Sequence, residues 1–286
     1  MNILITGANG YLAKNLIMEL SSKAKYKLIL LVREGSSIEE LLNYVNIKSI
    51  VFYNGNIESL NSLKHCKINL VFHLANYYPD SKRPAIPEQI INSNLTLIVN
   101  IVSSLGDKNL FKIINISSNA ADYDSSLYGI TKLATEKFLE ENYNCNTYRL
   151  HDTYGKNDPR PKLINQLINY SSTGKILEMK SAPNKIIHLA YIKDVINAFV
   201  SVIENPELCE NCKTVSPYPI KHIFSETLTL KEVIETFNKV SIKKVNVSWH
   251  NEQKTKFHPL KEPGELPRGW GPKYNLNMGL TEMLEL

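Results

Sequence analysis

The amino-acid sequence predicts an α/β fold, with a doubly wound parallel sheet and a smaller C-terminal lobe. Short apolar runs alternate with helix-like stretches through the first half of the chain, which is typical of a parallel sheet covered on both faces. A glycine-containing turn joins the first apolar run to a helix, as expected at the ligand-binding edge of such a sheet. After about residue 150 the alternation ends and turn-rich segments appear, which indicates the second lobe.

Six strands are expected in the first half, at residues 3–5, 28–32, 49–53, 70–74, 112–116 and 146–150. Helices are expected between them at residues 11–20, 37–46, 90–105 and 127–142. The second half predicts helices at 162–173, 191–203 and 230–240, a last strand at 221–224 and a short terminal helix. We therefore expect a dinucleotide-binding domain over residues 1–155, to which segments near 186–203 and 220–240 return. Residues 156–286 are expected to form mostly the non-contiguous second lobe, which would bind the substrate.

Composition and charge exclude several classes of protein. The net charge of +5 comes from 33 basic and 28 acidic residues that are scattered along the chain, so no nucleic-acid surface is predicted. Because no apolar run reaches membrane-spanning length and no signal peptide is evident, we expect a cytoplasmic protein without membrane contact. Four cysteines are too few for a disulfide framework.

No metal site is expected. Cys209 and Cys212 form one CxxC pair, but no second pair or nearby histidine completes a zinc site. Other histidines lack ligand spacing, so surface or hydrogen-bonded structural positions are expected for them. These are His65, His73, His188, His222, His250 and His258.

The turn after the first strand has the composition of a diphosphate-binding turn. Gly7 permits a tight turn, Gly10 permits close approach of a ligand, and Ala13 is small enough for helix–strand packing. The helix that follows directs its N-terminal N–H groups and its positive dipole end at the same place. A turn of small residues can also merely connect a strand and a helix. The strand–turn–helix context favours nucleotide binding.

A second motif lies on the helix expected at 127–142. Tyr128 and Lys132 are four residues apart and therefore share one helix face. A neighbouring cation stabilises a phenolate and so lowers a tyrosine pKa, which prepares the phenol for proton transfer worth roughly 10² to 10⁴ in rate. Ser118 follows the fifth strand and could bind the same substrate oxygen. An ordinary amphipathic helix is the alternative interpretation. We expect the opposite face, with Ile130, Leu133 and Ala134, to point to the core.

Together these motifs resemble the extended, nucleotide-sugar-modifying branch of the short-chain dehydrogenase/reductase superfamily, which has a Rossmann fold. The resemblance covers most of the chain and also rests on segments 55–57, 71–76, 116–118, 149–155, 191–195 and 269–272. It implies that the cofactor diphosphate is held at the first turn, by Thr6, Gly7, Asn9, Gly10, Tyr11 and Leu12. It further implies contacts to the adenine by Asn56 and Ile57, to the nicotinamide route by Leu74, Ala75 and Asn76, to the ribose by Lys132, and to the nicotinamide end by Leu150 and His151.

Within this branch the sequence is most similar to reductases that form 3,6-dideoxyhexoses, such as paratose and abequose, from a CDP-linked 4-keto sugar. They share a short separation between the hydroxyl residue and the tyrosine, here 10 residues from Ser118 to Tyr128. The resemblance implies hydride transfer to the carbonyl carbon, with Tyr128 protonating the oxygen, Ser118 holding it and Lys132 keeping Tyr128 acidic. The alternatives are a nucleotide-sugar 4-epimerase with tightly bound NAD and a non-catalytic dinucleotide sensor. The Tyr128/Lys132 pair argues against the sensor.

The substrate region departs from the family pattern. The family usually has an arginine for the substrate diphosphate where this chain has Ile187, and commonly Asn or His at the position of Asp152. We expect a nucleoside diphosphate between the sheet and the C-terminal lobe. The candidate substrate-binding residues are Tyr77, Tyr78, Asp152, Lys162 and Lys185. Tyr77 and Tyr78 can equally be packing residues, and Asp194 is expected to order the start of its helix.

The end of the second strand predicts the cofactor. Arg33 stands where NAD-binding folds usually carry an acidic residue, and its planar guanidinium suits the 2′-phosphate of NADP. Ser36 and Ser37 could donate further hydrogen bonds. NAD is the alternative, with Glu34 turned to the ribose and Arg33 in solvent. The resemblance also allows a homodimer formed through a pair of helices.

Overall fold

The computed structural model describes residues 1–81, 83–107, 110–205, 220–250 and 263–285. Cys209, Cys212 and His258 lie outside the described residues. The chain divides into two compact units, Met1–Arg149 and Leu150–Leu286. The domain boundaries expected from the sequence stay predictions. Within the described ranges, no helix is long and apolar enough to cross a membrane.

A seven-stranded sheet carries the fold, and it confirms the predicted fold class. Its strands are β1 (Asn2–Thr6), β2 (Lys27–Arg33), β3 (Ile47–Tyr53), β4 (Leu70–His73), β5 (Lys112–Ser118), β6 (Cys145–Leu150) and β10 (Lys221–Ile223). They are arranged in the order β10-β6-β5-β4-β1-β2-β3. β1 pairs in parallel with both β2 and β4, so the chain turns in opposite directions on the two sides of β1. Ligands of such sheets bind at this switch point, beyond the carboxyl ends of the strands.

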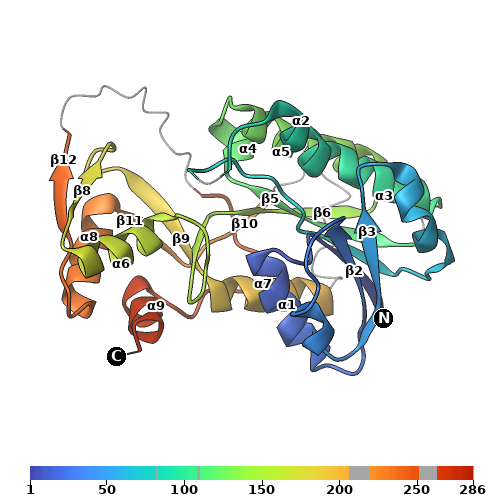
Figure 1. Ribbon diagram of the computed structural model, residues 1–286, viewed down its shortest axis with the longest axis horizontal. Helices are drawn as coiled ribbons and strands as arrows, with labels where there is room; N and C mark the ends of the chain where they lie inside the picture. Colours follow the sequence, from blue (N-terminus) through green and yellow to red (C-terminus); the bar gives the residue numbers. More distant parts are fainter. Residues whose placement is uncertain (82, 108–109, 206–219, 251–262, 286) are drawn as a thin grey trace. The chain divides into compact units, whose positions relative to one another are not determined.

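Helices cover both faces of the sheet in the first unit. α3 (Leu97–Leu105) and α5 (Leu127–Asn142) lie on one face, and α1 (Tyr11–Ser21) lies on the other (Figure 1). A continuous apolar core fills the space under α3 and α5, with Leu4, Val71 and Ile101 among its fully buried members. The strand and helix positions expected for this half are therefore largely confirmed.

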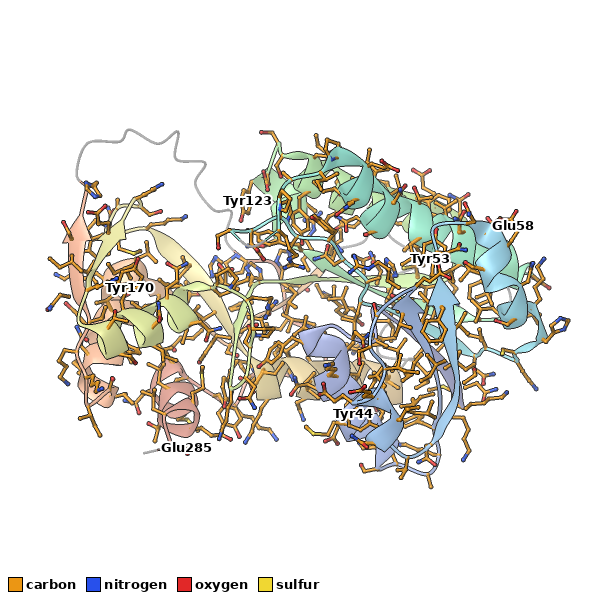
Figure 2. The ribbon with its side chains drawn as sticks, viewed as in Figure 1. Tyr44, Tyr53, Glu58, Tyr123, Tyr170 and Glu285 are labelled. Atoms are coloured by element: carbon orange, nitrogen blue, oxygen red, sulfur yellow. The ribbon has the colours of Figure 1, made fainter. Side chains whose placement is uncertain are left out.

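The helix expected at residues 37–46 is wrong. Only a short 3-10 turn, η1 (Leu41–Asn43), forms there. Leu41 is fully buried, but Leu42 and Val45 are 64% and 63% exposed, so this stretch has no apolar face to stabilise a helix. Tyr44, which Figure 2 labels, ends the turn.

The helix expected at residues 90–105 is interrupted. It consists of α2 (Pro87–Ile91), a π-helical turn η3 (Asn92–Thr96) and α3. Buried Asn94 lies in the π turn, and its side chain bonds the backbone of Tyr77: Oδ1 accepts from the N–H at 2.7 Å and Nδ2 donates to the carbonyl at 3.3 Å. Such π turns often accompany functional positions. This one joins the helix to the segment that follows β4.

The described residues of the second unit include two small sheets. β11 (Glu226–Thr229), β9 (Ile186–Tyr191) and β7 (Asp152–Tyr154) form one, and β12 (Asn246–Trp249) pairs with β8 (Ile176–Met179) in the other. Its helices are α6 (Leu163–Thr173), α7 (Ile192–Glu204), α8 (Leu230–Val240) and α9 (Leu276–Met283). The helices were expected, whereas these five short strands were not. Three to six residues give too little alternation to distinguish a strand from a loop.

Asp194 ties the C-terminal tail to this unit. Its buried carboxylate accepts hydrogen bonds from Ser225 Oγ at 2.8 Å and from the backbone N–H groups of Lys273 and Tyr274 at 2.8 and 3.1 Å. These contacts give Asp194 a structural role at the first turn of α7.

Candidate active site

The turn between β1 and α1 requires glycine. Gly7 has φ +65°, and a Cβ at this position would lie 2.8 Å from the Cα of Ala75, which follows β4. Gly10 is the N-cap of α1; no side chain caps the helix there, and its first turn contains no acidic residue. The backbone N–H groups of this turn therefore suit an anion. The cradle fits the diphosphate of a dinucleotide, with Tyr11 and Leu12 as the first helical residues.

Thr6 joins the carboxyl ends of β1 and β4. Its fully buried Oγ1 accepts hydrogen bonds from the N–H groups of Leu74 and Ala75, at 3.0 and 2.9 Å. With both acceptor positions filled, the hydroxyl proton is directed to Nδ1 of His73, 2.9 Å away. The Thr6 side chain thus fixes the two strand ends that flank the switch point. A contact of Thr6 with a cofactor stays a prediction.

His73 is a neutral residue of this region. Burial, with the nearby charge of Lys132, lowers the pKa of His73 to about 3. Since Nδ1 accepts from Thr6, the ring proton is on Nε2, for which the described residues provide no hydrogen-bond partner. His73 is therefore a hydrogen-bonded structural histidine, as expected, but through Nδ1 alone.

Tyr128 and Lys132 lie on the buried face of α5, as expected from their spacing. Lys132 is 2% exposed, and its Nζ donates to the Ile116 carbonyl of β5 at 2.9 Å. Burial lowers the pKa of Lys132 to about 8, although Glu136 acts to raise it. The Tyr128 hydroxyl accepts from Asn76 Nδ2 at 3.3 Å, and the Tyr78 ring meets the Tyr128 ring edge-on, with centroids 4.9 Å apart. The structure therefore brings four residues of the predicted site onto one helix face and the segment after β4.

The predicted apolar face of α5 is wrong. Ile130 and Leu133 are 54% and 40% exposed and do not point to the core, whereas the buried face carries polar residues. Thr135 Oγ1 donates to the Asn94 carbonyl at 2.7 Å, and Asn94 Nδ2 donates to Thr131 Oγ1 at 3.2 Å. Hydrogen bonds to the π turn, rather than apolar contacts, therefore orient this part of the helix.

Sequence reasoning missed Asn94, and also Gly129. A Cβ on Gly129 would lie 2.1 Å from the Asp124 carbonyl oxygen and 2.8 Å from that of Ala120, so only glycine lets α4 (Ala120–Tyr123) and its following turn pack on α5. Ser118 ends β5 just before α4, and its Oγ accepts from the Ala120 N–H at 3.2 Å. The signal for Gly129 was a glycine within a helical run, which often marks close packing.

The remaining cofactor residues of the prediction lie around the glycine turn and β3. Asn9 Nδ2 donates to the Ser37 carbonyl at 2.9 Å and so attaches the segment after β2 to the turn. Arg33 and Glu34 are both exposed. Asn56 and Ile57 begin η2 (Ile57–His65), and the Asn56 N–H donates to Asn54 Oδ1 at 3.0 Å.

Tyr77 and Tyr78 differ in their surroundings. Tyr77 is 7% exposed, and its hydroxyl donates to the Pro84 carbonyl at 2.9 Å. Tyr78 is 41% exposed and contacts Tyr128 as described above. A role in packing fits Tyr77, whereas substrate binding by Tyr78 stays a prediction.

Asp152 and Lys162 form an ion pair in the second unit. Lys162 Nζ and Asp152 Oδ1 are 3.0 Å apart, and the two side chains are 27% and 52% exposed. Partial burial opposes ionisation, but Lys162, His151 and Lys185 hold the pKa of Asp152 below its ordinary value. Ile187 is buried in β9 opposite Leu228 of β11. Ile187, at the position of the family's usual arginine, is therefore a buried sheet residue. Lys162 and Lys185 provide the positive charge near Asp152.

Three histidines and Phe224 form a cluster in the second unit, called here the histidine cluster: His151, His188, His222 and Phe224. His151 Nε2 and His222 Nδ1 are 2.8 Å apart, and the rings of His151 and His188 meet edge-on with centroids 4.9 Å apart. His188 Nδ1 bonds Thr227 Oγ1 at 2.8 Å, and burial lowers the pKa of His188. His151 follows Leu150, which is 8% exposed at the end of β6. Across the described residues, no group of three His, Cys, Asp or Glu is placed to hold a metal ion.

Two known proteins are similar to this chain in sequence. The chain is 27% identical over 254 residues to the CDP-abequose synthase of Yersinia pseudotuberculosis, covering 84% of each protein. It is 28% identical over 218 residues to the UDP-2-acetamido-2,6-beta-L-arabino-hexul-4-ose reductase of Pseudomonas aeruginosa, covering 71% of this chain and 50% of that protein.

Solved structures share the fold. The UDP-glucose 4-epimerase of Thermus thermophilus, in complex with NAD, superposes with a TM-score of 0.74 at 16% identity, covering 100% of this chain and 98% of that one. The ADP-L-glycero-D-manno-heptose-6-epimerase of Helicobacter pylori gives 0.75 at 16% identity, covering 99% and 95%. The model of the NAD dependent epimerase/dehydratase family matches residues 3–216. The chain therefore belongs to the NAD dependent epimerase/dehydratase family.

Proposed function

We propose that this protein is an oxidoreductase that reduces a 4-keto deoxy sugar linked to a nucleoside diphosphate, in deoxysugar or surface-polysaccharide biosynthesis. The observation that carries the proposal is the buried face of α5, where Tyr128 contacts the segment after β4 and Lys132 contacts β5. The likeness to a CDP-abequose synthase and to a hexul-4-ose reductase supports the same reaction class.

The residues of the first unit divide the work. The Gly7–Gly10 turn and the start of α1 would hold the cofactor diphosphate; when bound, a reduced nicotinamide supplies the hydride. Tyr128 would donate the proton to the carbonyl oxygen, Ser118 would bind that oxygen, and Lys132 would favour ionisation of the phenol. Asn76, which donates to the Tyr128 hydroxyl, would orient it.

The proposed cofactor is NADPH. Arg33 is exposed at the end of β2, and the Asn9–Ser37 hydrogen bond holds the following segment against the glycine turn. A guanidinium there would bind a 2′-phosphate bidentately. The test compares kcat/KM for NADPH and NADH in the wild type and in Arg33→Ala. We expect a wild-type preference for NADPH that falls about tenfold or more in the variant. A preference for NADH, or one unchanged by Arg33→Ala, contradicts this assignment.

For the substrate, we propose that Lys162 and Lys185 bind the nucleoside diphosphate. They would take the role of the family's usual arginine, whose position is occupied by Ile187 in this chain. Calorimetry with CDP, UDP, GDP and dTDP, with and without saturating cofactor, tests this directly. We expect one of the four nucleotides to bind more tightly than the others, and CDP is the expected one. No binding of any of them at millimolar concentration would point to a small carbonyl substrate.

The reductase is distinguished from a 4-epimerase by native mass spectrometry of the purified protein. An epimerase recycles its NAD and keeps it through purification, whereas a reductase consumes NADPH stoichiometrically. Stoichiometric NAD on the protein, without net oxidation of NADPH during turnover, would favour the epimerase.

We also propose a homodimer formed through the exposed Ile130 and Leu133 of α5, which sedimentation of the wild type and of Ile130→Asp would test.

A further inference from the structure

A charge cluster of the first unit follows Lys132 along α5: Glu136 and Arg149 are buried, and Asp122 is a partly exposed third member. Arg149 grips the Glu136 carboxylate with two hydrogen bonds, from Nε to Oε1 at 3.0 Å and from Nη2 to Oε2 at 2.7 Å. Its Nη1 also bonds Asp122 of α4. Glu136 and Arg149 are only 1% and 7% exposed. Burying a charge costs folding free energy that pairing offsets only in part. The cost that remains suggests a role of this cluster beyond packing.

Glu136 continues the row begun by the two catalytic residues. Tyr128, Lys132 and Glu136 are spaced by four residues along α5, so they follow one another on the same helix face. Glu136 supplies the opposite charge that offsets, in part, the burial of the Lys132 ammonium. His73 of β4 also lies near Lys132 and is neutral, and the Ile116 carbonyl of β5 accepts a hydrogen bond from the Lys132 ammonium.

Asp122 extends the cluster to the serine. α4 begins two residues after Ser118 and is held to α5 through Arg149, which comes from β6. One guanidinium therefore connects the strand end of Ser118, through α4, with the helix that carries Tyr128 and Lys132.

We propose that Glu136, clamped by Arg149, is a positioning residue: its charge keeps Lys132 as an ammonium ion, and the link from Arg149 to Asp122 fixes α4, behind Ser118, against α5. The inference rests on the proposed function for the roles of Lys132 and Ser118. Its first test needs no substrate, so the two can fail separately.

The test is the titration of Lys132, followed by NMR of protein labelled with ¹³C at the lysine Cε, with Lys132→Arg to assign the signal. In Glu136→Gln we expect the midpoint of Lys132 to fall by about one pH unit or more, because a nearby buried counter-charge is lost. Glu140→Gln is the matched control. It removes the same charge from the same helix, but from a surface pair with Lys137, and we expect it to leave the midpoint unchanged.

A second variant keeps the test decisive if Glu136→Gln does not fold. Asp122→Asn removes a partly exposed carboxylate and leaves the Arg149–Glu136 pair intact. We expect a smaller fall of the Lys132 midpoint in the same direction. An unchanged midpoint in the variants that fold overturns the inference.

Activity then separates the inference from the proposed function. With NADPH and a CDP-linked 4-keto-6-deoxy sugar, the alkaline limb of the kcat profile should move to lower pH with the Lys132 midpoint. A shifted midpoint with an unshifted kcat profile would uphold the role of Glu136 and contradict the catalytic role of Lys132.

Discussion

The α5 face of the first unit and the Asp152–Lys162 region of the second unit are built in different ways. The first places its key residues four apart on one helix, so local spacing alone brings them together. The second draws on β7, α6, β9 and β10, and its residues are up to 71 positions apart, as for His151 and His222. Only tertiary pairing brings these residues together, which explains why the sequence named Asp152 and Lys162 but did not predict the contacts of the histidine cluster.

The two regions also differ in how their charges are held. The Glu136–Arg149 pair is almost fully buried, whereas Asp152 is 52% exposed and Lys162 27%. An exposed ion pair contributes little to stability, but it can exchange partners with a ligand, while a buried pair is costly to disturb. The side chains of the first region are thus held by buried contacts, whereas the exposed ion pair of the second region can rearrange, as the proposed substrate contact requires.

The largest effect should come from the first region. We expect Tyr128→Phe to lower kcat by a hundredfold or more, since about 10² to 10⁴ is the contribution of a general acid, while cofactor affinity stays nearly the same. Tyr44→Phe, in the η1 turn, is the matched control and should behave like the wild type. Steady-state kinetics and cofactor titration measure both. Full turnover by the phenylalanine variant would remove Tyr128 from the proton-donating role.

The next prediction concerns stability at the same face. The pKa of Lys132 falls from 10.5 in the unfolded chain to about 8 on folding, so at pH 7 the folded state carries the cost of a buried charge. Lys132→Met should therefore raise the free energy of unfolding at pH 7 by up to about 3 kcal/mol. The gain should shrink as the pH rises from about 8 and vanish above 10.5, where lysine is neutral in both states.

Chemical denaturation at pH 7, 9 and 10.5 tests this linkage. Lys137→Met on the exposed side of α5 serves as the control, because its ammonium is 55% exposed, and we expect no comparable change. A Lys132→Met protein that is less stable than the wild type at pH 7 would show that the pairing of Lys132 outweighs its burial.

How far the sequence predicts each region follows from the same difference. The glycine turn, the individual strands of the large sheet and the Tyr128/Lys132 pair depend on residues close in sequence, and their positions were expected. The buried face of α5 was misjudged because Thr131 accepts a hydrogen bond from Asn94 and Thr135 donates one to it. Asn94 is some 40 positions away, and its π turn has no local signature. The histidine cluster escaped for the same reason, since β9 and β10 bring His188 and His222 to His151 only in the folded chain.

A substitution at Gly129 tests whether close packing of α4 on α5 contributes to the stability of the first region. In Gly129→Ala the new Cβ would meet two backbone carbonyl oxygens of α4 and its following turn, which cannot move as a side chain can. We expect a loss of about 1–3 kcal/mol in unfolding free energy, as for overpacked cores. Gly271→Ala is the control, because a Cβ there meets nothing within 4 Å. Equal stability of the two variants would mean that α4 yields without cost.

The smallest expected effect belongs to the second region. If Lys162 binds a substrate diphosphate, Lys162→Met removes one charge-assisted contact but also frees Asp152, whose carboxylate would repel the phosphates. The affinity for the preferred nucleoside diphosphate should fall about tenfold, equivalent to about 1.4 kcal/mol, with little change in Tm because the pair is partly exposed. In the double variant Lys162→Met/Asp152→Asn, part of the lost affinity should return, since the repelling charge is gone. Lys231→Met, a surface change at a residue 67% exposed on α8, controls for the loss of net charge. Calorimetry at low and high salt measures all three. If the affinity drops equally in Lys162→Met and Lys231→Met, the loss comes from the change in net charge. That result would contradict the role of the second region in substrate binding.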